Sequence, residues 1–421
     1  MRRARTFLLI AAVAATTTGG ARAAEIAVPT GGGLAEAVAS AAPGDVLDLA
    51  PGVHLGAVVI ATPRLTLQGA PGAIVDGQAK GSTITIRATG VTLRGLTIRR
   101  SGLSLFDKDS GVFIDRGADH AIVVDNHLDR DLIGVYLDGP KDALVRHNRI
   151  EGLRTIRVNE RGPGVEVFDT PGSRIIDNDF SYGRDGVFSV NSHDDEVRGN
   201  RFRNLRFAVH FMYTNNSSVI DNVSVGNEIG FALMYSDHLV VTGNASDRDR
   251  DHGLLFNYVN DSRVEDNAVR DSDKCVFIYN TNKNRFSGNW FQGCNIGIHF
   301  TAGSEQNQMT GNSFVDNRIQ VMYVGTRSLD WSVNGRGNYY SDNPSFDTNG
   351  DGIADEPYRP NDLMDQVIWR APEAKLLLNS PAVQAIRWAQ ARFPAIHPGG
   401  VFDSAPLMKP RPPPALKRLS G

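Results

Sequence analysis

The chain has 421 residues, of which 41% are hydrophobic and 22% are charged, a composition typical of an ordinary globular protein. Its formal net charge is −3, so it has no general excess of basic residues for holding a polyanion. These values exclude an intrinsically disordered chain. They also argue against a nucleic-acid-binding protein, because such proteins bind phosphates through a basic surface that releases counterions.

The first 23 residues have the pattern of an export signal. Three arginines precede an apolar run from Phe7 to Ala15, and Ala21 and Ala23 form a small-residue cleavage pattern. The twin-arginine route stays an alternative, but the residues that usually follow the paired arginines are absent, which favours ordinary secretion. After cleavage no apolar run reaches the roughly 20 residues needed to span a bilayer. We expect the mature chain to work outside the cytoplasm.

Residues 33–42, "GLAEAVASAA", predict a short amphipathic helix in front of the first strands, "DVLDLA" and "LTLQG". The chain then becomes repetitive. Asparagine recurs with a spacing of 22 or 23 residues, mostly after Asp or Gly, at Asn178, Asn200, Asn222, Asn244, Asn267, Asn289 and Asn312. A period of this length is the signature of a solenoid, and asparagines stacked at the corners would form a ladder.

Short strands run in step with the asparagines, and each begins at a small or polar residue. These first residues are Gly134, Gly164, Gly186, Ala208, Gly230, Gly253, Cys275, Gly297 and Gln320. About 22 residues in extended conformation make a closed circuit of roughly 70 Å. The sequence therefore predicts an all-β fold, a right-handed parallel β-helix over residues 24–330, with the helix at 33–42 as its N-terminal cap.

Cys275 and Cys294 are the only cysteines. An oxidising compartment permits a disulfide, but their offsets in the repeat are unequal, so pairing and two separate buried thiols both stay open. A metal site made from two isolated cysteines is the less favoured alternative.

The outward face of these strands is unusual. If the first residue of each strand is position zero, alternation places positions one and three in the core and positions two and four outside. None of the fourteen outward residues from the coil of Gly186 onward is charged. They are Phe188, His210, Ala232, Leu255, Phe277, His299, Met322, Val190, Met212, Met234, Asn257, Tyr279, Thr301 and Val324. Such a face is expected to be covered by the chain's own C-terminal segment, by a second copy or by another protein.

Soft metal ligands lie on the same face. Met212 and Met234 occupy one column in adjacent coils, with His210 nearby, and His299 and Met322 form a second neighbouring pair. Thioether and imidazole groups together suit cuprous copper better than magnesium or calcium. The competing interpretation is that the methionines only fill gaps at an adaptable surface and that the histidines bind no metal.

Beyond Trp331 the period stops. A looped segment leads to a predicted helix over 381–393, with Ser380 as N-cap and with apolar Val383, Ile386, Trp388 and Phe393. The proline-rich tail, residues 409–421, is expected to be extended or disordered. Within the loop, Asp347, Asn349, Asp351 and Asp355 follow the spacing of the first half of a calcium-binding loop, but Tyr358 stands where the last glutamate ligand belongs. A plain turn rich in Asp and Asn is the alternative.

The 22-residue coils, the export signal and above all the stretch from "GRGNYYSDNPSFDTNGDGIADEPYRPNDLMDQV" to "GGVFDSAPLM" resemble the NosD family. The coils alone are a weak signal because many carbohydrate-active β-helices share them, whereas residues 331–408 are far more specific. The resemblance implies a periplasmic protein that assists maturation of nitrous oxide reductase. It implies that 331–408 is a cap and docking segment.

The resemblance also implies the partners: an ABC transporter permease with its ATPase, a copper chaperone lipoprotein and nitrous oxide reductase. Copper would be bound transiently in the cuprous state, and no catalytic residue is expected. We further expect Phe188, Leu255, Phe277 and Tyr279 on the coils, and the apolar residues of the helix at 381–393, to contact partners.

The alternative from a different class is a carbohydrate-active enzyme: a polysaccharide lyase, a glycosidase or a uronate epimerase. Such an enzyme would place carboxylates on adjacent outward positions. Asp138 and Glu166 are the acids that fit, with Tyr136 beside them, but the insertion "RTIRVNERGPG" lies between these coils. The central columns offer no basic groove for a polyuronate, which disfavours this alternative.

Overall fold

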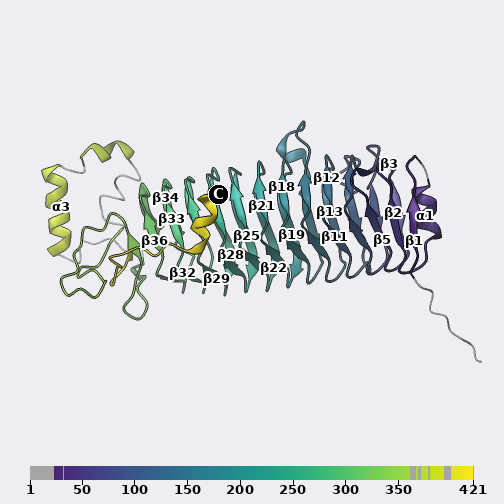
Figure 1. Cartoon of the computed structure of the whole chain (residues 1–421). Helices are drawn as coiled ribbons and strands as arrows, with labels where there is room; N and C mark the ends of the chain where they lie inside the picture. Colours follow the sequence, from purple (N-terminus) through teal and green to yellow (C-terminus); the bar gives the residue numbers. More distant parts are fainter. Residues whose placement is uncertain are drawn as a thin grey trace, which may run out of the picture.

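The computed structural model of the chain describes residues 23–31, 33–325, 327–360, 367, 371–377, 380–392 and 400–420. Figure 1 shows one long stack of coils, so the predicted parallel β-helix is confirmed. Each complete coil contributes one strand to each of three sheets, and every strand pairs in parallel with its equivalent in the next coil. The predicted export signal lies outside the described residues, except for its last residue.

The first sheet has thirteen strands. In stacking order they are β1 (Glu25–Val28), β2 (Val46–Leu49), β5 (Thr66–Gly69), β8 (Thr92–Arg94), β11 (Ile122–Val124), β14 (Leu144–Arg146), β17 (Arg174–Ile176), β20 (Glu196–Arg198), β23 (Ser218–Ile220), β26 (Val240–Thr242), β29 (Arg263–Glu265), β32 (Arg285–Ser287) and β35 (Gln308–Thr310).

The second sheet also has thirteen strands. They are β3 (Gly52–Leu55), β6 (Ala73–Asp76), β9 (Thr97–Arg99), β12 (His127–Asp129), β15 (Arg149–Glu151), β18 (Asp179–Ser181), β21 (Arg201–Arg203), β24 (Val223–Val225), β27 (Ala245–Asp247), β30 (Ala268–Arg270), β33 (Trp290–Gln292), β36 (Ser313–Val315) and β39 (Tyr339–Tyr340).

The third sheet has twelve strands, and its middle strands are the longest of the fold. They are β4 (Val58–Ile60), β7 (Ile84–Ile86), β10 (Ser110–Ile114), β13 (Ile133–Asp138), β16 (Val165–Phe168), β19 (Asp185–His193), β22 (Phe207–Asn215), β25 (Ile229–Asp237), β28 (His252–Asn260), β31 (Lys274–Tyr279), β34 (Ile296–Thr301) and β37 (Ile319–Val324).

The interior is packed by stacked apolar side chains. Positions one and three of the third sheet are buried, as predicted from alternation: Val187, Ser189, Val209, Phe211, Phe231, Leu233, Leu254, Phe256, Val276, Ile278, Ile298, Phe300, Val321 and Tyr323. Aromatic rings of neighbouring coils stack in the same way, for example Phe180 on Phe202 at 4.9 Å between ring centroids. At the C-terminal end Trp331 packs against Phe300 and Phe314 and closes this core.

The predicted asparagine ladder is present and runs further than the sequence spacing indicated. In each step the backbone N–H and side-chain amide of one asparagine donate to the Oδ1 of the next. The ladder runs through Asn126, Asn148, Asn178, Asn200, Asn222, Asn244, Asn267, Asn289, Asn312 and Asn338. Asn338 then donates to Asp403 of the C-terminal segment, so the stack extends past the predicted boundary at residue 330.

The two ends of the stack are closed by different means. Helix α1 (Leu34–Ser40) caps the N-terminal end with Leu34 and Val38 buried, as predicted (Figure 1). At the other end, β38 (Leu329–Asp330) pairs with β40 (Val401–Phe402). Helix α3 (Pro381–Arg392) begins after Ser380, whose Oγ accepts a hydrogen bond from the N–H of Val383, so the predicted N-cap is confirmed. Among the described residues, no helix combines the length and apolarity needed to cross a bilayer.

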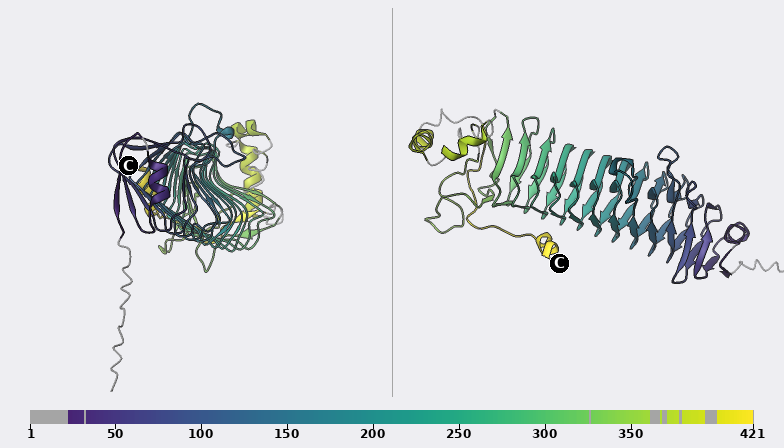
Figure 2. Two further views of the ribbon diagram at one scale, coloured as in Figure 1. Left: turned by 90° about the vertical axis from the view of Figure 1, so that its right-hand side faces the viewer. Right: turned by 90° about the horizontal axis from the view of Figure 1, so that it is seen from above.

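Three short 3₁₀ helices complete the described elements: η1 (Val158–Glu160), η2 (Pro372–Leu377) and η4 (Pro414–Ser420). The last of these differs from the prediction of an extended or disordered tail. Residues 409–420 return along the outside of the coils, and η4 packs on the second sheet (Figure 2). The physical reason is that the sheet offers an uncharged column there, which composition of the tail alone could not reveal.

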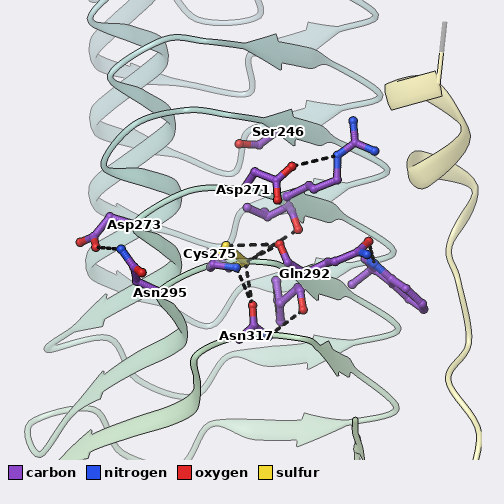
Figure 3. Close-up of a disulfide and its surroundings, with 12 residues drawn as sticks. Ser246, Asp271, Asp273, Cys275, Gln292, Asn295 and Asn317 are labelled. Atoms are coloured by element: carbon purple, nitrogen blue, oxygen red, sulfur yellow. Dashed lines mark hydrogen bonds and ion pairs between the residues drawn. A yellow bond between two sulfur atoms is a disulfide. The ribbon is translucent and has the colours of Figure 1, made fainter. Parts of the chain in front are cut away.

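Cys275 and Cys294 form a disulfide, which decides the pairing that the sequence left open (Figure 3). Cys275 lies near the start of β31, and Cys294 lies one coil later in the corner between β33 and β34. Their offsets in the repeat are unequal, as the spacing indicated, since Lys274 and not Ser272 is the register partner of Ile296, yet the two Cα atoms lie 5.7 Å apart. Both cysteines are buried.

Candidate functional site

The outer face of the third sheet carries the predicted site residues. In the coils of β19, β22, β25 and β28 the strands are nine residues long, so this face is broadest there. The outward positions are mostly half-buried or buried although they face away from the core, because they stack tightly on one another from coil to coil. Ala232 and Leu255 form a small apolar cluster with Ile229, Phe207 and Met234.

Two residues of this cluster, Phe207 and Ile229, belong to a third outward column that strict alternation of side chains did not predict. Asp185 pairs with Phe207 and Val187 pairs with Val209, but the small residues between them, Gly186 and Ala208, are not register partners. The backbone bends at this small residue, so the residue just before it also points outward. The column consists of Asp185, Phe207, Ile229, His252, Lys274, Ile296 and Ile319. The face is therefore not free of charge, since Asp185 and Lys274 belong to it. Both are ion-paired, to Arg206 and to Asp273 respectively.

His210 is held in an aromatic cage. Its ring stacks on Phe188 at 4.8 Å and meets the edge of Phe207 at 5.0 Å. Its Nδ1 lies 3.5 Å from the buried carboxylate of Asp185, an ion-pair distance rather than a hydrogen bond. Burial acts to raise the pKa of Asp185, but His210, Arg206 and Arg184 outweigh it and the pKa is lowered. Both ring nitrogens of His210 are buried without a hydrogen-bond partner among the described residues.

The methionine pair is brought together as the repeat predicted. Met212 and Met234 are register partners on adjacent strands, and both side chains are half-buried. Asn257 is the register partner of Met234 in the following coil. Its Oδ1 is buried and has no hydrogen-bond partner in the part of the chain that the structure describes. Two thioethers and an amide oxygen thus line one column over three coils.

A second group lies further along the face. His299 and Met322 are register partners, as predicted, and the edge of Phe277 contacts His299 at 5.0 Å. Phe277 also meets His252, at 5.4 Å between ring centroids; strict alternation did not predict this histidine because it occupies the bent column. The Nδ1 atoms of both histidines are buried and lack a partner within the described ranges.

The two histidines are kept neutral. Burial, with the positive charge of Lys274 added, lowers the pKa of His252 to about 4, and the same two causes lower the pKa of His299. A neutral imidazole keeps a lone pair free on one nitrogen, which is the form that binds metals. The geometry therefore provides unprotonated nitrogen ligands at neutral pH.

Tyrosines border this face. Tyr213, Tyr235 and Tyr258 stack at 5.1 and 5.0 Å between centroids, and Tyr279 meets Tyr258 edge-on at 6.0 Å. The three stacked residues have φ between 49° and 53°, in the left-handed region that favours Asn and Gly. Asn occupies the same corner in the flanking coils, at Asn191 and Asn280. The tyrosines are between 38% and 51% exposed, so their rings form a ridge in solvent.

The remaining residues predicted to contact partners differ in exposure. Phe188 and Phe277 are half-buried, Leu255 is buried and Tyr279 is exposed. On α3, Val383 is buried at 4% exposure, whereas Ile386 and Trp388 are 36% and 61% exposed; Phe393 lies outside the described residues. Helix α3 stands beyond the last coils in Figures 1 and 2, so it does not cover Met212 and Met234.

The calcium-like residues lie together in one exposed loop. The carboxylate of Asp347 accepts backbone N–H groups from Gly350, Asp351 and Gly352, and that of Asp355 accepts from Thr348. Asn349 and Asp351 hydrogen-bond to each other. The loop is therefore closed by its own hydrogen bonds, and calcium binding stays a prediction.

One cluster of potential ligands was not predicted. His127, Asp129 and Glu151 offer atoms within 4.8 Å of one another on β12 and β15. Glu151 is already paired with His127 at 3.0 Å and with Arg154 at 3.0 Å, so its carboxylate is neutralised. The signal in the sequence is the register of adjacent coils, which sets Asp129 opposite Glu151.

The acids proposed for the enzyme alternative do not form a pair. Glu166 is buried and bound to Lys108 at 2.6 Å, while Asp138 is near Arg116 at 3.9 Å. Tyr136 is buried beside Glu166, and burial raises its pKa. Each acid is engaged by a separate cation.

Comparisons with known proteins identify the family. The family model "Periplasmic copper-binding protein (NosD)" matches residues 146–345. A protein of Stutzerimonas stutzeri named "Probable ABC transporter binding protein NosD" is 39% identical over 85% of both chains. A protein of Pseudomonas aeruginosa with the same name is 39% identical over 86% of this chain and 89% of its own.

Solved structures with the same fold are distant in sequence. The surface adhesin PfbA of Streptococcus pneumoniae has a TM-score of 0.53 at 11% identity, covering 66% of this chain and 91% of its own. The PL6 family alginate lyase AlyGC has a TM-score of 0.55 at 15% identity, covering 77% and 53%. These likenesses concern the fold alone. The sequence relatives are binding proteins rather than enzymes, and by its identity to them over most of its length the chain belongs to the NosD family of periplasmic copper-binding proteins.

Proposed function

We propose that this chain receives cuprous copper on the outer face of the third sheet and serves an ABC transporter as a docking platform for assembly of the copper–sulfide centre of nitrous oxide reductase. Family membership and the relatives' name, "Probable ABC transporter binding protein NosD", support a role beside such a transporter. Copper is cargo in this proposal. It would be transient, and the chain performs no bond chemistry on it.

One observation carries the copper part: on an outer face whose two charged residues, Asp185 and Lys274, are ion-paired, buried ring nitrogens lack partners among the described residues. A buried polar atom without a hydrogen bond costs free energy, so it favours any ligand that fills the position. Thioethers beside it make the donor set soft, which suits a cuprous ion. Met212 and Met234 would form one contact, and His252, His299 and Met322 a second. His210 is less accessible because its ring is enclosed by Phe188 and Phe207.

A competition titration with a chromophoric cuprous chelator tests this proposal. We expect Met212→Leu with Met234→Leu to weaken copper binding at least tenfold, because leucine fills the space without a sulfur donor. Met309→Leu is the matched control, since Met309 is buried in the core and should leave binding unchanged. Unaltered affinity in the double variant, with its circular dichroism intact, would remove the methionine pair from the proposal.

The docking part is supported by the exposed ridge of tyrosines and by α3. A permease with its ATPase, a copper chaperone lipoprotein and the reductase are the proposed partners. Ile386→Ser with Trp388→Ser should release the chain from membranes that contain the permease, whereas the buried Val383 is left intact so that the helix stays packed. Retained membrane association of this variant would exclude α3 as the anchor.

Tyr235→Asn tests the ridge separately. Asparagine suits the left-handed backbone of this corner, so the coil should stay folded while the ring is lost. Reduced co-purification of a partner with this variant supports docking at the ridge, and undiminished co-purification of all the proposed partners contradicts it.

A further inference from the structure

The second sheet has an outward column whose character changes halfway along the stack. The first residue of each strand from β12 to β21 is charged or titratable: His127, Arg149, Asp179 and Arg201. From β24 to β36 the equivalent residues are uncharged: Val223, Ala245, Ala268, Trp290 and Ser313. None of these five is more than 8% exposed. Charged side chains keep an outward column in water, so the uncharged part must be covered.

The cover is the chain's own C-terminal segment, residues 409–420, which we call the strap. Its path along the stack is visible in Figures 1 and 2, and Figure 3 shows it beside the coil edge that carries Asp271 and Gln292. The N–H of Arg411 donates to Ser313 Oγ at 3.2 Å. Ala415 has no exposed surface and packs with Ala268 and Trp290.

Arg418 fixes the far end of the strap. Its guanidinium donates to the backbone oxygen of Asp221 at 2.5 Å and pairs with the Asp221 carboxylate at 2.7 Å. Ser313 and Asp221 are four coils apart, about 19 Å at the usual strand spacing. Seven residues in mixed polyproline and 3₁₀ geometry cover about 17 Å, so the strap lies along the column without slack.

Proline chemistry sets how the strap can bind. Prolines at 410, 412, 413 and 414 have a fixed φ and no N–H, so this part cannot join a sheet as an extra strand. It is already ordered before it docks, which reduces the entropy lost on binding. Trp290 supplies an aromatic wall, and its indole N–H is satisfied by Gln292 at 3.0 Å. Proline-rich peptides dock into shallow grooves with such walls.

We propose that the column from Val223 to Ser313 is a peptide-binding groove and that the strap is its occupant in cis. The ligand class is a short proline-containing peptide with a small residue for the contact at Ala268 and Trp290 and with an arginine three residues later for Asp221. In the described part of the strap, the anchoring contacts are limited to the buried Pro413 and Ala415, the partly buried Leu416, the hydrogen bond from Arg411 to Ser313 and the partly exposed ion pair of Arg418 with Asp221. A competing peptide of the same class can therefore displace the strap. This groove is separate from the proposed copper face and does not depend on it.

The test uses the full chain and a fluorescent peptide with the sequence of residues 409–421. Ala415→Glu places a carboxylate in the buried contact, so it should release the strap and open the groove. We expect the peptide to bind this variant at least tenfold more tightly than the wild-type chain, whose groove is filled. Adding Ala268→Glu to the variant should abolish binding, and a peptide carrying Ala415→Glu should not bind.

Trypsin gives an independent readout, since the strap contains cleavable bonds after Lys417 and Arg418. Cleavage there should be at least tenfold faster in Ala415→Glu than in the wild type, with unchanged circular dichroism. Absence of peptide binding to the folded Ala415→Glu variant overturns the groove. Equal peptide binding to the wild type overturns cis occupancy, and so does a wild-type dimer that dissociates in Ala415→Glu, because the occupant would then be the strap of a second copy.

Discussion

Replacing Asn222 by alanine should destabilise the middle of the stack severely. Asn222 is fully buried, and its side chain makes four hydrogen bonds. Its Oδ1 accepts from the N–H and the amide of Asn200, each at 3.0 Å. Its Nδ2 donates to Val197 O at 2.8 Å and to Asn244 Oδ1 at 3.0 Å. Alanine leaves the N–H of Asn200 without its acceptor and removes a donor from Val197 O.

The magnitude follows from these two groups. A buried group left without its partner costs about 1–3 kcal/mol, so for the two groups together we expect a loss of roughly 2–6 kcal/mol in the free energy of unfolding. Asn191→Gly is the control, because Asn191 is exposed at a left-handed corner where glycine is equally suited. Its cost should stay within about 0.5 kcal/mol.

Urea unfolding followed by circular dichroism measures the total loss, and hydrogen exchange locates it. Coils of a solenoid contact only their neighbours, so the loss of protection should centre on β20, β23 and β26 and fade with distance. A loss below about 1 kcal/mol, or a loss of protection spread evenly along the chain, would refute the idea that the ladder carries this part of the fold.

Two further predictions concern buried groups outside the proposed sites. Burial raises the pKa of Asp195 to about 7, above its unfolded value of 3.8, so its carboxylate destabilises the fold as the pH rises from about 4 to 7. Asp195→Asn should therefore stabilise the chain at pH 8 by roughly 2–4 kcal/mol and hardly at pH 4, and urea midpoints at both pH values check this. The disulfide between Cys275 and Cys294 closes a loop of 19 residues in the unfolded chain, so Cys275→Ala with Cys294→Ala should lower the free energy of unfolding by about 3 kcal/mol. Urea midpoints of this variant and of the wild type with and without reductant measure the loss, and equal midpoints in all cases would contradict it.

The sequence predicted most of the coil architecture because the repeat is enforced by stacking. A spacing of 22 or 23 residues puts each asparagine above the last, and alternation then assigns the core columns. Asn126 and Asn148 escaped because the insertion between β15 and β16 stretches the next interval to 30 residues, although it leaves the ladder intact. A constant spacing in the sequence is seen only where successive coils have the same length. The ladder forms wherever asparagines occupy the same corner of successive coils, even when one coil is longer.

The site was predicted less completely because it depends on departures from alternation. Met212 and Met234 meet as expected, since both lie in the regular part of the strand. His252 was missed because the backbone bends at the following glycine and turns its side chain outward. The strap was missed for a different reason: its composition resembles an unstructured tail, and its partners, Ala268 and Trp290, are more than a hundred residues away in the sequence.

Because all coils have the same height, the number of coils fixes distances along the stack. Each coil adds one strand spacing, about 4.8 Å, to the length of the stack. The separation between the methionine pair and α3 is thus set by the number of coils between them and can change only in steps of that size. Deleting or duplicating one whole coil would keep the asparagine ladder continuous through the remaining coils and yet change the distance between the two ends of the molecule, so the number of coils alone can set its length.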